Sequence, residues 1–447
     1  MIPLDSPRFQ ILPQSLTTQE RYQFLKNISM ARASSYLPRR DSNSSTNVIE
    51  ATAYRMLSNY YATELFFGTG QLVNPYVLLD TGDDKTWIQC IECNPCFEIK
   101  GPNINASASV SYQLLSVDDP RCNPRLPYMW ACGFKSVYGG GASTFGLMGT
   151  DTFLFINAQT KKPDFFFAVA FGCGLKNQNF DFGLNTGPNN LISGIFGLAP
   201  GPQSFLNQLD GITQGRFSYC LTSWVEPDLG MSTIHFGPSA QLDGPNVQEI
   251  HMNAKDRYHL FLRGISVDGK RLPIHPSICT LDQSQGIVTK GFFIDSGAPY
   301  TLLPTSAYQP LRAAIVDYFS RYGWRAIGQR VFDLCYLTGP RGSQTFPSVV
   351  FHFAGTGIGA REVDWVMDKD NMFVKIDSGG DGFCMVVGQV PDPGPCLFGA
   401  YQQANFRILY DVKNWILRFA PDKCQENRPL YDRSDMIRYA QKGAPST

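Results

Sequence analysis

The amino-acid sequence predicts an all-β protein, mainly strands with a few short helices, built as two similar lobes with a cleft between them. Short apolar runs rich in aromatic residues recur between turns, and the 41 glycines and 30 prolines are spread along the chain. One phrase, an apolar run followed by Asp, a hydroxyl residue and Gly, occurs twice, at residues 75–82 and 291–297. A phrase repeated at long spacing indicates a duplicated unit.

Four segments follow one another along the chain. Residues 1–50 begin with a predicted short helix, where Thr17 and Glu20 form a capping box, and continue as a polar linker. Residues 58–245 form the predicted N-terminal lobe, with strands in runs such as "YYATELFFGTG" and "PYVLLD". Residues 250–424 repeat this style as the C-terminal lobe, and the polar residues 425–447 form a flexible tail.

One clear helix is predicted inside the second lobe. The segment "TSAYQPLRAAIVDYFSRYG" has apolar residues at helical spacing, with Thr305 as its N-cap and Gly323 at its end.

The charge balance excludes some partners. Charged residues make up 17% of the chain, below the roughly 25% of an average globular domain, and the formal net charge is zero. Nucleic acid and membrane surfaces both favour a basic patch, so neither is the expected partner. The longest apolar run, Phe165–Phe171, is too short to span a membrane and fits a buried strand. We expect a monomer without a cofactor.

The 12 cysteines indicate a disulfide framework in an oxidising compartment. Sequons at Asn27, Asn43 and Asn105 agree with a glycoprotein. We therefore predict a secreted (apoplastic) or vacuolar protein, although "MIPLDSPRFQ" lacks the apolar core of a signal peptide. The spacing of Cys90, Cys93 and Cys96 leaves a metal or cluster site as an alternative, which needs a fourth soft ligand and a reducing compartment.

The repeated phrase predicts a pair of carboxylates. Asp80 and Asp295 each end an apolar strand, where packing holds them rigidly, and the following glycine allows a tight turn. A second shared phrase follows in each half, at Gly194–Gly197 and at Leu397–Gly399. Two such lobes facing each other about a pseudo-twofold axis would bring the two aspartates together.

Such a pair has a defined chemistry. Two carboxylates about 3 Å apart cannot both ionise easily, so they hold one proton between them. The ionised half can polarise a water molecule, and the protonated half can hydrogen-bond a carbonyl under attack. The expected reaction is direct hydrolysis of a peptide bond. A carbohydrate-active enzyme is disfavoured, because its two acids lie roughly 5 Å or more apart.

These motifs resemble those of the pepsin-like aspartic proteases, and within them the plant nepenthesin-like group, over about residues 58–424. Asp80-Thr81-Gly82 and Asp295-Ser296-Gly297 match the two catalytic triplets, and Trp87 stands where the family has its tryptophan. "FGCG", "FSYCL" and "FAPDKC" are typical of the plant group. The resemblance implies a bilobal fold of two β-barrel-like lobes, catalysis by the two aspartates and a polypeptide substrate.

The segment "VYGGGASTFGLMGTDTF" resembles the flap hairpin of this family. Tyr138 falls at the flap tyrosine, and Gly139 to Gly141 would give a mobile tip. The resemblance implies that Tyr138 closes over the substrate and hydrogen-bonds toward Trp87.

The resemblance also extends to cysteines and to the N-terminus. It implies the bridges Cys335–Cys384 and Cys220–Cys424, and Cys279 and Cys396 are candidates for one more because both flank motifs of the second lobe. The other six, whose pairing stays open, are Cys90, Cys93, Cys96, Cys122, Cys132 and Cys173. "LDSPRFQILP" resembles a propeptide, which would block the cleft as an inhibitory prosegment and be released near Arg39 and Arg40.

The chain departs from the family pattern beside each triplet. Asp83 stands where the family has a serine that donates a hydrogen bond to the catalytic aspartate. An ionised carboxylate cannot donate, and its charge would raise the pKa values of the pair. Either Asp83 protonates and donates, or it turns away toward Lys85, or the site is crippled. Ala298 replaces a hydroxyl residue at the second triplet, and Gly140 stands where the flap often has an acid.

Two hypotheses remain. The first is an active acid endopeptidase that cuts between bulky apolar residues of an extended substrate. The second is a catalytically weak or inactive binding protein on the same fold, as in the plant glycosidase-inhibitor branch. That branch usually lacks a catalytic aspartate, whereas this chain retains both, and Asp83 keeps the second hypothesis open.

Overall fold

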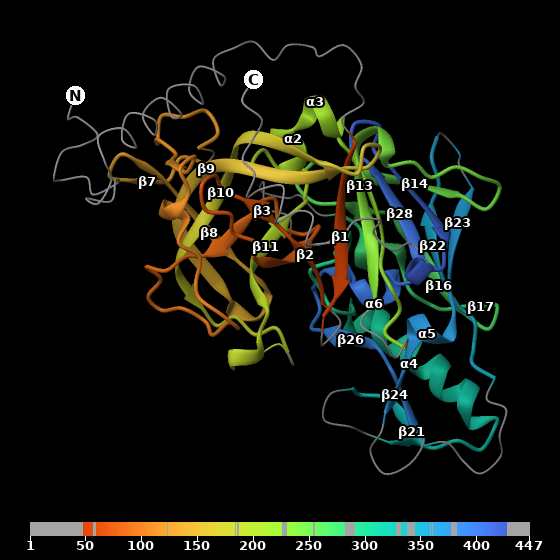
Figure 1. The fold of residues 1–447 in the computed structure, drawn as a ribbon. Coiled ribbons are helices and arrows are strands. Elements are labelled where there is room, and N and C mark those ends of the chain that lie inside the picture. The colour runs from red at the N-terminus through yellow and green to blue at the C-terminus, as the bar shows by residue number, and fades with distance from the viewer. Residues whose placement is uncertain are drawn as a thin grey trace, which may run out of the picture.

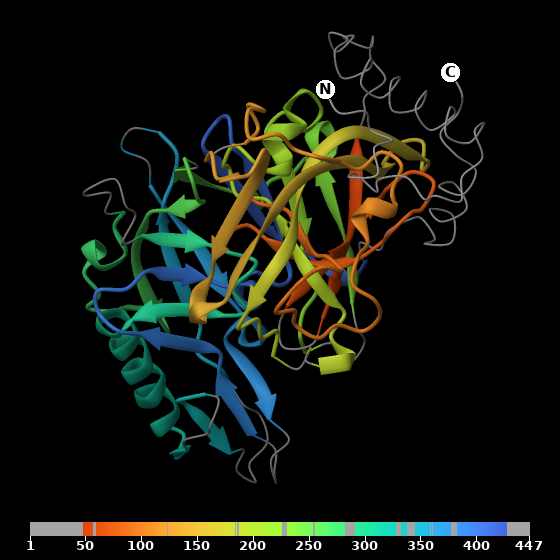
Figure 2. The same ribbon diagram turned by 90° about the vertical axis from the view of Figure 1, so that its left-hand side faces the viewer.

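The computed structural model describes residues 48–426, apart from 57–59, 123, 184, 186, 226–229, 254, 282–290, 328–331, 338–344, 358, 360 and 377–381. The predicted N-terminal helix, the linker up to residue 47, Asn27, Asn43 and the tail from residue 427 lie outside these residues. Strands dominate, as predicted, and they form two lobes that lie side by side (Figure 1). The view turned by 90° shows the same division (Figure 2).

Among its described residues, the first half of the chain has thirteen strands and two short α-helices. They are β1 (Ile49–Arg55), β2 (Tyr61–Glu64), β3 (Phe66–Phe67), β4 (Tyr76–Asp80), β5 (Trp87–Gln89), β6 (Gln113–Leu114), β7 (Pro127–Tyr128), β8 (Ala131–Val137), β9 (Ser143–Asn157), β10 (Pro163–Gln178), β11 (Ile192–Gly197), α2 (Phe205–Gln208), α3 (Asp210–Thr213), β12 (Arg216–Cys220) and β13 (Met231–Phe236). The first two residues of β1 therefore lie within the predicted linker.

The second half repeats the strand-rich pattern and adds one long helix. Its elements are β14 (Gln248–Asn253), β15 (His259–Leu260), β16 (Leu262–Val267), β17 (Lys270–Arg271), β18 (Phe292–Ile294), β19 (Thr301–Pro304), α4 (Thr305–Ser320), β20 (Ala326–Ile327), β21 (Cys335–Leu337), β22 (Val349–Ala354), β23 (Glu362–Met367), α5 (Lys369–Met372), β24 (Phe373–Ile376), β25 (Gly382–Met385), β26 (Val387–Val390), β27 (Cys396–Phe398), α6 (Ala400–Gln403), β28 (Phe406–Asp411) and β29 (Ile416–Pro421).

The strand pairing repeats between the two halves. Strand β4 pairs in parallel with β11 and antiparallel with β2, and β18 pairs in parallel with β27 and antiparallel with β15. Each shared phrase of the sequence thus lies beside its own aspartate-bearing strand, with Gly197 opposite Asp80 and Phe398 opposite Ile294. The duplication predicted from the sequence is confirmed at the level of sheet topology.

A sheet between the lobes joins them. Its strands run in the order β1, β13, β12, β28, β29 and β14, all antiparallel, so both halves of the chain contribute (Figure 1). Because β12 pairs with β28 along five residues, the lobes are tied by backbone hydrogen bonds as well as by side-chain packing.

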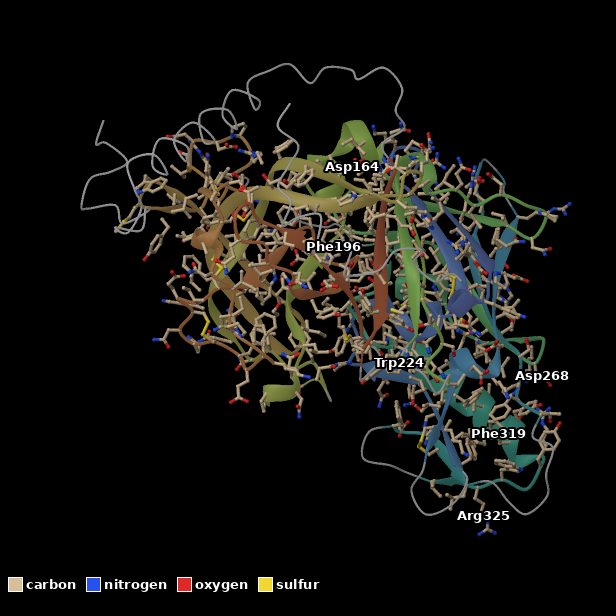
Figure 3. All side chains as sticks on the ribbon, in the orientation of Figure 1. Asp164, Phe196, Trp224, Asp268, Phe319 and Arg325 are labelled. Atoms are coloured by element: carbon tan, nitrogen blue, oxygen red, sulfur yellow. A yellow bond between two sulfur atoms is a disulfide. The ribbon has the colours of Figure 1, made fainter. Side chains whose placement is uncertain are left out.

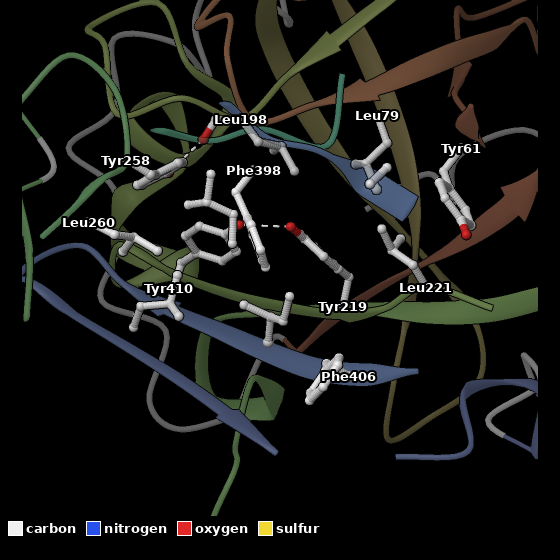
Figure 4. Close-up of a cluster of buried hydrophobic side chains, with 14 of the residues drawn as sticks. Tyr61, Leu79, Leu198, Tyr219, Leu221, Tyr258, Leu260, Phe398, Phe406 and Tyr410 are labelled. Carbon is white, nitrogen blue, oxygen red and sulfur yellow. Dashed lines mark hydrogen bonds between the residues drawn. The ribbon is translucent and has the colours of Figure 1, made fainter. Parts of the chain in front are cut away.

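A cluster of buried tyrosines lies between the two aspartate-bearing strands and the sheet that joins the lobes (Figure 4). The hydroxyls of Tyr219 and Tyr410 are 2.7 Å apart, and Tyr219 also hydrogen-bonds Gln403. The Tyr258 hydroxyl donates to the Leu198 carbonyl at 2.6 Å, which links the second lobe to the loop after β11. Buried hydroxyls that are paired in this way add direction to apolar packing and fix how the lobes meet.

All 12 cysteines form disulfides within the described residues, which confirms the predicted framework. Cys335–Cys384, Cys220–Cys424 and Cys279–Cys396 pair as expected. The pairing that the sequence left open is Cys90–Cys173, Cys93–Cys96 and Cys122–Cys132 (Figure 3). Cys90, Cys93 and Cys96 are thus engaged with other cysteines, which leaves no thiolate of this group to bind a metal.

The predicted long helix is present, but Thr305 is not its cap. Helix α4 has Pro304 at the N-cap, and the Thr305 hydroxyl donates to the Val390 carbonyl instead. The Asp392 carboxylate accepts from the Ser306 N–H, so a residue from elsewhere in the chain satisfies the free end of the helix. The helix ends at Ser320, three residues before Gly323.

The apolar run Phe165–Phe171 lies in β10, where it is interrupted by a bulge between Phe166 and Val169 that exposes Phe167. Among the described residues, none of the helices combines the length and the apolar character that a membrane span requires.

Candidate active site

Asp80 is the last residue of β4, and Asp295 directly follows β18. Backbone hydrogen bonds fix the position of each aspartate. Asp80 is 6% exposed, and its carbonyl accepts from the Leu198 N–H at 2.8 Å. The Asp295 N–H donates to the Phe398 carbonyl at 3.0 Å. The apolar runs "VLL" and "FFI" are buried on these strands, so packing and backbone bonding both fix where the aspartates emerge.

Two crossed hydroxyls join the triplets. The Thr81 N–H donates to Ser296 Oγ at 3.1 Å, and the Ser296 N–H donates to Thr81 Oγ1 at 3.0 Å. Each hydroxyl also donates a hydrogen bond to a carbonyl of the opposite strand, Thr81 to that of Ile294 and Ser296 to that of Leu79. Both side chains are fully buried and every group is paired, so this network sets the lobes in one register around the aspartates.

The glycines of the triplets let the carboxyls approach each other. A Cβ on Gly82 would lie 2.7 Å from an Asp295 carboxyl oxygen, and a Cβ on Gly297 would lie 2.6 Å from an Asp80 carboxyl oxygen. Each glycine N–H also donates to the aspartate of its own triplet, at 2.7 Å from Gly82 and 2.8 Å from Gly297. Only hydrogen fits at these positions, which gives both glycines a physical role.

The two carboxyls are hydrogen-bonded to each other and titrate as a pair. Burial, then the negative charges of Asp295 and Asp83, raises the pKa of Asp80 well above its usual value. Burial also raises the pKa of Asp295, although hydrogen bonds from Gly297 and Asp80 act in the opposite direction. The pair therefore keeps one proton at pH values where isolated aspartates have lost theirs.

The predicted flap is a hairpin of β8 and β9. Its tip is Gly139–Gly141, where Gly140 and Gly141 have φ of 74° and 83°, a conformation that favours glycine. Trp87 Nε1 donates to the Tyr138 hydroxyl at 2.7 Å, the contact that the resemblance implied. Trp87 itself is fully buried on β5, so the flap tyrosine is bonded to a rigid part of the first lobe.

Of the three alternatives left open by the sequence, Asp83 turns away from Asp80 toward Lys85, but it contacts the backbone of Lys85 and not its ammonium group. Its Oδ1 accepts from the Lys85 backbone N–H at 3.1 Å, whereas the Lys85 ammonium pairs with Asp84 at 2.9 Å. Its Oδ2 accepts from the Tyr138 hydroxyl at 2.6 Å. Asp83 is thus directed at the flap. Ala298, the residue that follows the second triplet, offers no polar side chain.

Several aromatic residues near the pair were not singled out from the sequence. The rings of Phe97 and Phe180 pack on Trp87, and Phe180 also packs on Tyr138. Burial, together with the charges of Asp181, Tyr300, Asp80 and Asp295, raises the pKa of Tyr60 to about 12. The density of aromatic residues around 60 and 180 was the available signal, but nothing in the sequence separated these rings from core residues.

The loop after β5 carries the C-x-x-C-x-x-C segment beside this aromatic group. Cys90–Cys173 ties it to β10, and the Gln89 side chain holds its Phe97 and Asn103 by hydrogen bonds of 2.7 to 2.9 Å. The sequon residue Asn105 is exposed on the same loop. Within the described part of the chain, no three His, Cys, Asp or Glu side chains are grouped as a metal site.

Comparisons with known proteins agree with this geometry. Two family models match successive parts of the chain, xylanase inhibitor N-terminal at residues 61–238 and xylanase inhibitor C-terminal at residues 257–421. Aspartic proteinase nepenthesin-2 from Nepenthes gracilis is 30% identical over 363 residues, which cover 78% of this chain and 74% of that protein. Aspartyl protease AED1 from Arabidopsis thaliana is 30% identical over 357 residues, 78% of this chain and 68% of its own.

The chain belongs to the nepenthesin-like family of plant aspartic proteases. The crystal structure of basic 7S globulin from soybean has the same fold, with a TM-score of 0.66 over 86% of this chain and 100% of the globulin, at 17% identity. This nepenthesin-like chain therefore has relatives named as proteases, and its fold also occurs in a protein named as a globulin.

Proposed function

We propose that the protein is an aspartic endopeptidase that hydrolyses peptide bonds at acidic pH with a water molecule activated between Asp80 and Asp295. The observation that carries the proposal is the close approach of each carboxyl to the glycine of the opposite triplet, held by the crossed hydroxyls of Thr81 and Ser296. Two aspartates with a purely structural role would not require this symmetric network, or a glycine in each triplet at a position where a Cβ would collide with the opposite carboxyl.

The chemistry follows from one shared proton. One carboxyl of the pair holds the proton and acts as the acid, and the other is ionised and acts as the base. The water oxygen attacks the carbonyl carbon, the base takes a proton from the water, and the acid gives its proton to the carbonyl oxygen. The tetrahedral product then collapses and the C–N bond breaks. The carboxyl that took the water proton gives it to the leaving amine, and the other carboxyl takes a proton from a hydroxyl of the tetrahedral carbon as the carbonyl re-forms. The pair ends with one proton, as it began.

The expected substrate is an extended polypeptide with bulky apolar residues at the cut. The aromatic side chains of Phe180 and Tyr60 near the pair suit apolar residues, and Tyr138 on the flap would cover the bound chain. We propose that the segment before β1 acts as a prosegment, that Asn27, Asn43 and Asn105 carry glycans, and that the protein is a monomer. Six disulfides support a secreted or vacuolar location.

The test is an acid cleavage assay with matched variants. The chain is expressed with its first 50 residues, acidified, and assayed on a denatured protein with and without a transition-state-mimic inhibitor. Asp295→Ala is the inactive control. We expect inhibitor-sensitive cleavage that Asp295→Ala abolishes. A parent protein no more active than Asp295→Ala across acid pH would remove the protease proposal.

A second candidate, a non-proteolytic binding protein, is favoured by one residue and one comparison. Asp83 replaces a donor to the catalytic aspartate, and the matching family models are described as those of xylanase inhibitors. Asp83→Ser discriminates between the candidates: recovery of cleavage in this variant alone would locate the defect at residue 83. Inhibition of a xylanase by a parent protein that cleaves nothing would support the binding role.

A further inference from the structure

The carboxylate of Asp83 accepts two hydrogen bonds, one from its own loop and one from the flap. In the loop, the Lys85 N–H donates to Oδ1, and the backbone carbonyl of Asp83 accepts from the Ala199 N–H at 2.9 Å, which fixes the backbone. From the flap, the Tyr138 hydroxyl donates to Oδ2 at 2.6 Å. Residue 83 and residue 138 are 55 positions apart, so this bond spans from the aspartate loop to the flap.

The Tyr138 hydroxyl has one hydrogen, and Asp83 receives it. The hydroxyl oxygen accepts from Trp87 Nε1 at 2.7 Å. A bond to an ionised acceptor is roughly twice as strong as a neutral one. The flap tyrosine is therefore attached at two points, one of them charged, and a serine at position 83 could not accept from Tyr138 with a full negative charge.

We propose that Asp83 is a flap-positioning residue, whose carboxylate binds the Tyr138 hydroxyl and holds the flap hairpin over Asp80 and Asp295. This inference rests on the proposed function, because it assigns a role to the same site. It also explains why the chain retains a working geometry around the pair despite a third acid. In this chain residue 83 hydrogen-bonds the flap tyrosine, whereas the serine of the family pattern donates a hydrogen bond to the catalytic aspartate.

The neighbouring charges make this contact sensitive to pH. Burial raises the pKa of Asp83, and the Lys85 charge and the Tyr138 hydrogen bond oppose that rise. The charge of Asp84 in the same loop also raises the pKa of Asp83, and the charge of Asp83 in turn raises the pKa of Asp80. As the pH falls through this raised pKa, Asp83 becomes neutral and its bond to Tyr138 weakens.

Amide hydrogen exchange of the segment 136–144 tests the inference without any need for turnover. The variants are Asp83→Ala and Asp83→Asn, and the matched control is Asp84→Asn. This control removes the same charge at the next residue, whose side chain pairs with Lys85. We expect flap exchange to rise about tenfold or more in Asp83→Ala, less in Asp83→Asn, and not in Asp84→Asn. Asp83→Ala added to Tyr138→Phe should cause no further rise, because the hydroxyl that Asp83 binds is already absent.

Two more readouts separate a positioning role from general stability. The flap exchange of the parent protein, normalised to intrinsic rates, should rise as the pH falls, whereas that of Asp83→Asn should stay flat. On a peptide substrate, Asp83→Asn should raise KM while kcat changes little. Unfolding temperatures near the parent's show that the variants remain folded.

The outcomes distinguish this inference from the proposed function. Unchanged flap exchange in Asp83→Ala, or an equal rise in Asp84→Asn, overturns the inference even if the protein is an active protease. A loosened flap in a protein that cleaves nothing supports the contact and instead overturns the endopeptidase proposal.

Discussion

The two lobes surround their aspartates in the same way up to the third residue of each triplet and then differ. In both, an aspartate ends a buried strand, a hydroxyl reaches the opposite lobe, and a glycine packs on the opposite carboxyl. The fourth residue is Asp83 in the first lobe and Ala298 in the second.

The backbone at this fourth position does similar work in both lobes. The Asp83 carbonyl accepts from the Ala199 N–H at 2.9 Å, and the Ala298 carbonyl accepts from the Ala400 N–H at 2.8 Å. The side chain is therefore free to vary without loss of the turn. Among the described residues, the flap hairpin lies in the first lobe, and the fourth residue of that lobe bonds it. Under the proposed function, the comparison assigns catalysis to the symmetric part and contact with the substrate side to the asymmetric part.

The largest expected effect comes from the symmetric aspartates. Asp80→Asn and Asp295→Asn should each lower kcat/KM by roughly 10⁴-fold or more, because one carboxyl cannot both give and take a proton. The measurement is cleavage of a denatured protein at acidic pH. Asp84→Asn is the control and should retain most of the activity, since Asp84 pairs with Lys85 outside the network. If either variant kept more than a tenth of the parent's activity, the two aspartates would not be equally required for cleavage.

Much of this comparison could be predicted from the sequence, because its parts are local. An apolar run followed by Asp, a hydroxyl residue and Gly fixes a strand end and a turn, and two copies predict two facing acids. Asp80, Asp295 and the second shared phrase of each half follow from this repeated pattern, and the structure adds that those phrases lie on β11 and β27, the parallel partners of the aspartate strands. The contact of Trp87 with Tyr138 came from the resemblance, and the structure has it at 2.7 Å.

The parts that depend on distant side chains could not be predicted. Asp83 could have bonded Asp80, Lys85 or nothing, and only the position of the flap, 55 residues away, decides in favour of Tyr138. The partner of Cys90 lies 83 residues along the chain on β10. The cap of α4 likewise comes from Asp392, so no local motif at Thr305 could reveal it.

The next effect tests whether the aspartates need the glycines beside them. Gly82→Ala and Gly297→Ala should each lower kcat by on the order of 10²-fold, because the new methyl would lie 2.6 to 2.7 Å from the opposite carboxyl and push it aside. The effects should be alike in the two lobes. Gly139→Ala at the flap tip, where a Cβ meets nothing within 4 Å, is the control. An unchanged kcat in either triplet variant would show that the opposite carboxyl can accommodate a methyl group at this position.

A buried histidine beside the second aspartate-bearing strand adds an acid sensitivity that the matching position of the first lobe lacks. His259 pairs with Phe293, two residues before Asp295, and the equivalent residue of the first lobe is Ala62, which pairs with Leu78. Burial outweighs a backbone hydrogen bond with Cys279 and lowers the pKa of His259 to about 4. The lowered pKa means that the unfolded chain binds the proton more tightly. Stability is therefore complete above about pH 6.5 and falls by about 3 kcal/mol toward pH 4.

His259→Leu tests this difference. The free energy of unfolding, measured by denaturant at several pH values, should depend less on pH between 6.5 and 4 in the variant than in the parent protein. His251→Gln changes an exposed histidine and serves as the control. An equally steep fall in His259→Leu would assign the acid sensitivity to other groups.

The smallest effect concerns the crossed hydroxyls, and it tests the symmetry most directly. Thr81→Val keeps the shape of the side chain but leaves the buried Ser296 N–H without its acceptor, and Ser296→Ala does the same to the Thr81 N–H. Each variant should lose about 1–3 kcal/mol of unfolding free energy, measured by denaturant at neutral pH. The two losses should match, because each hydroxyl accepts one N–H and donates to one carbonyl of the other lobe. If Ser296→Ala alone were harmless, the first lobe would be holding the pair by itself, and the second carboxyl would be positioned by the glycine and the strand rather than by the crossed network.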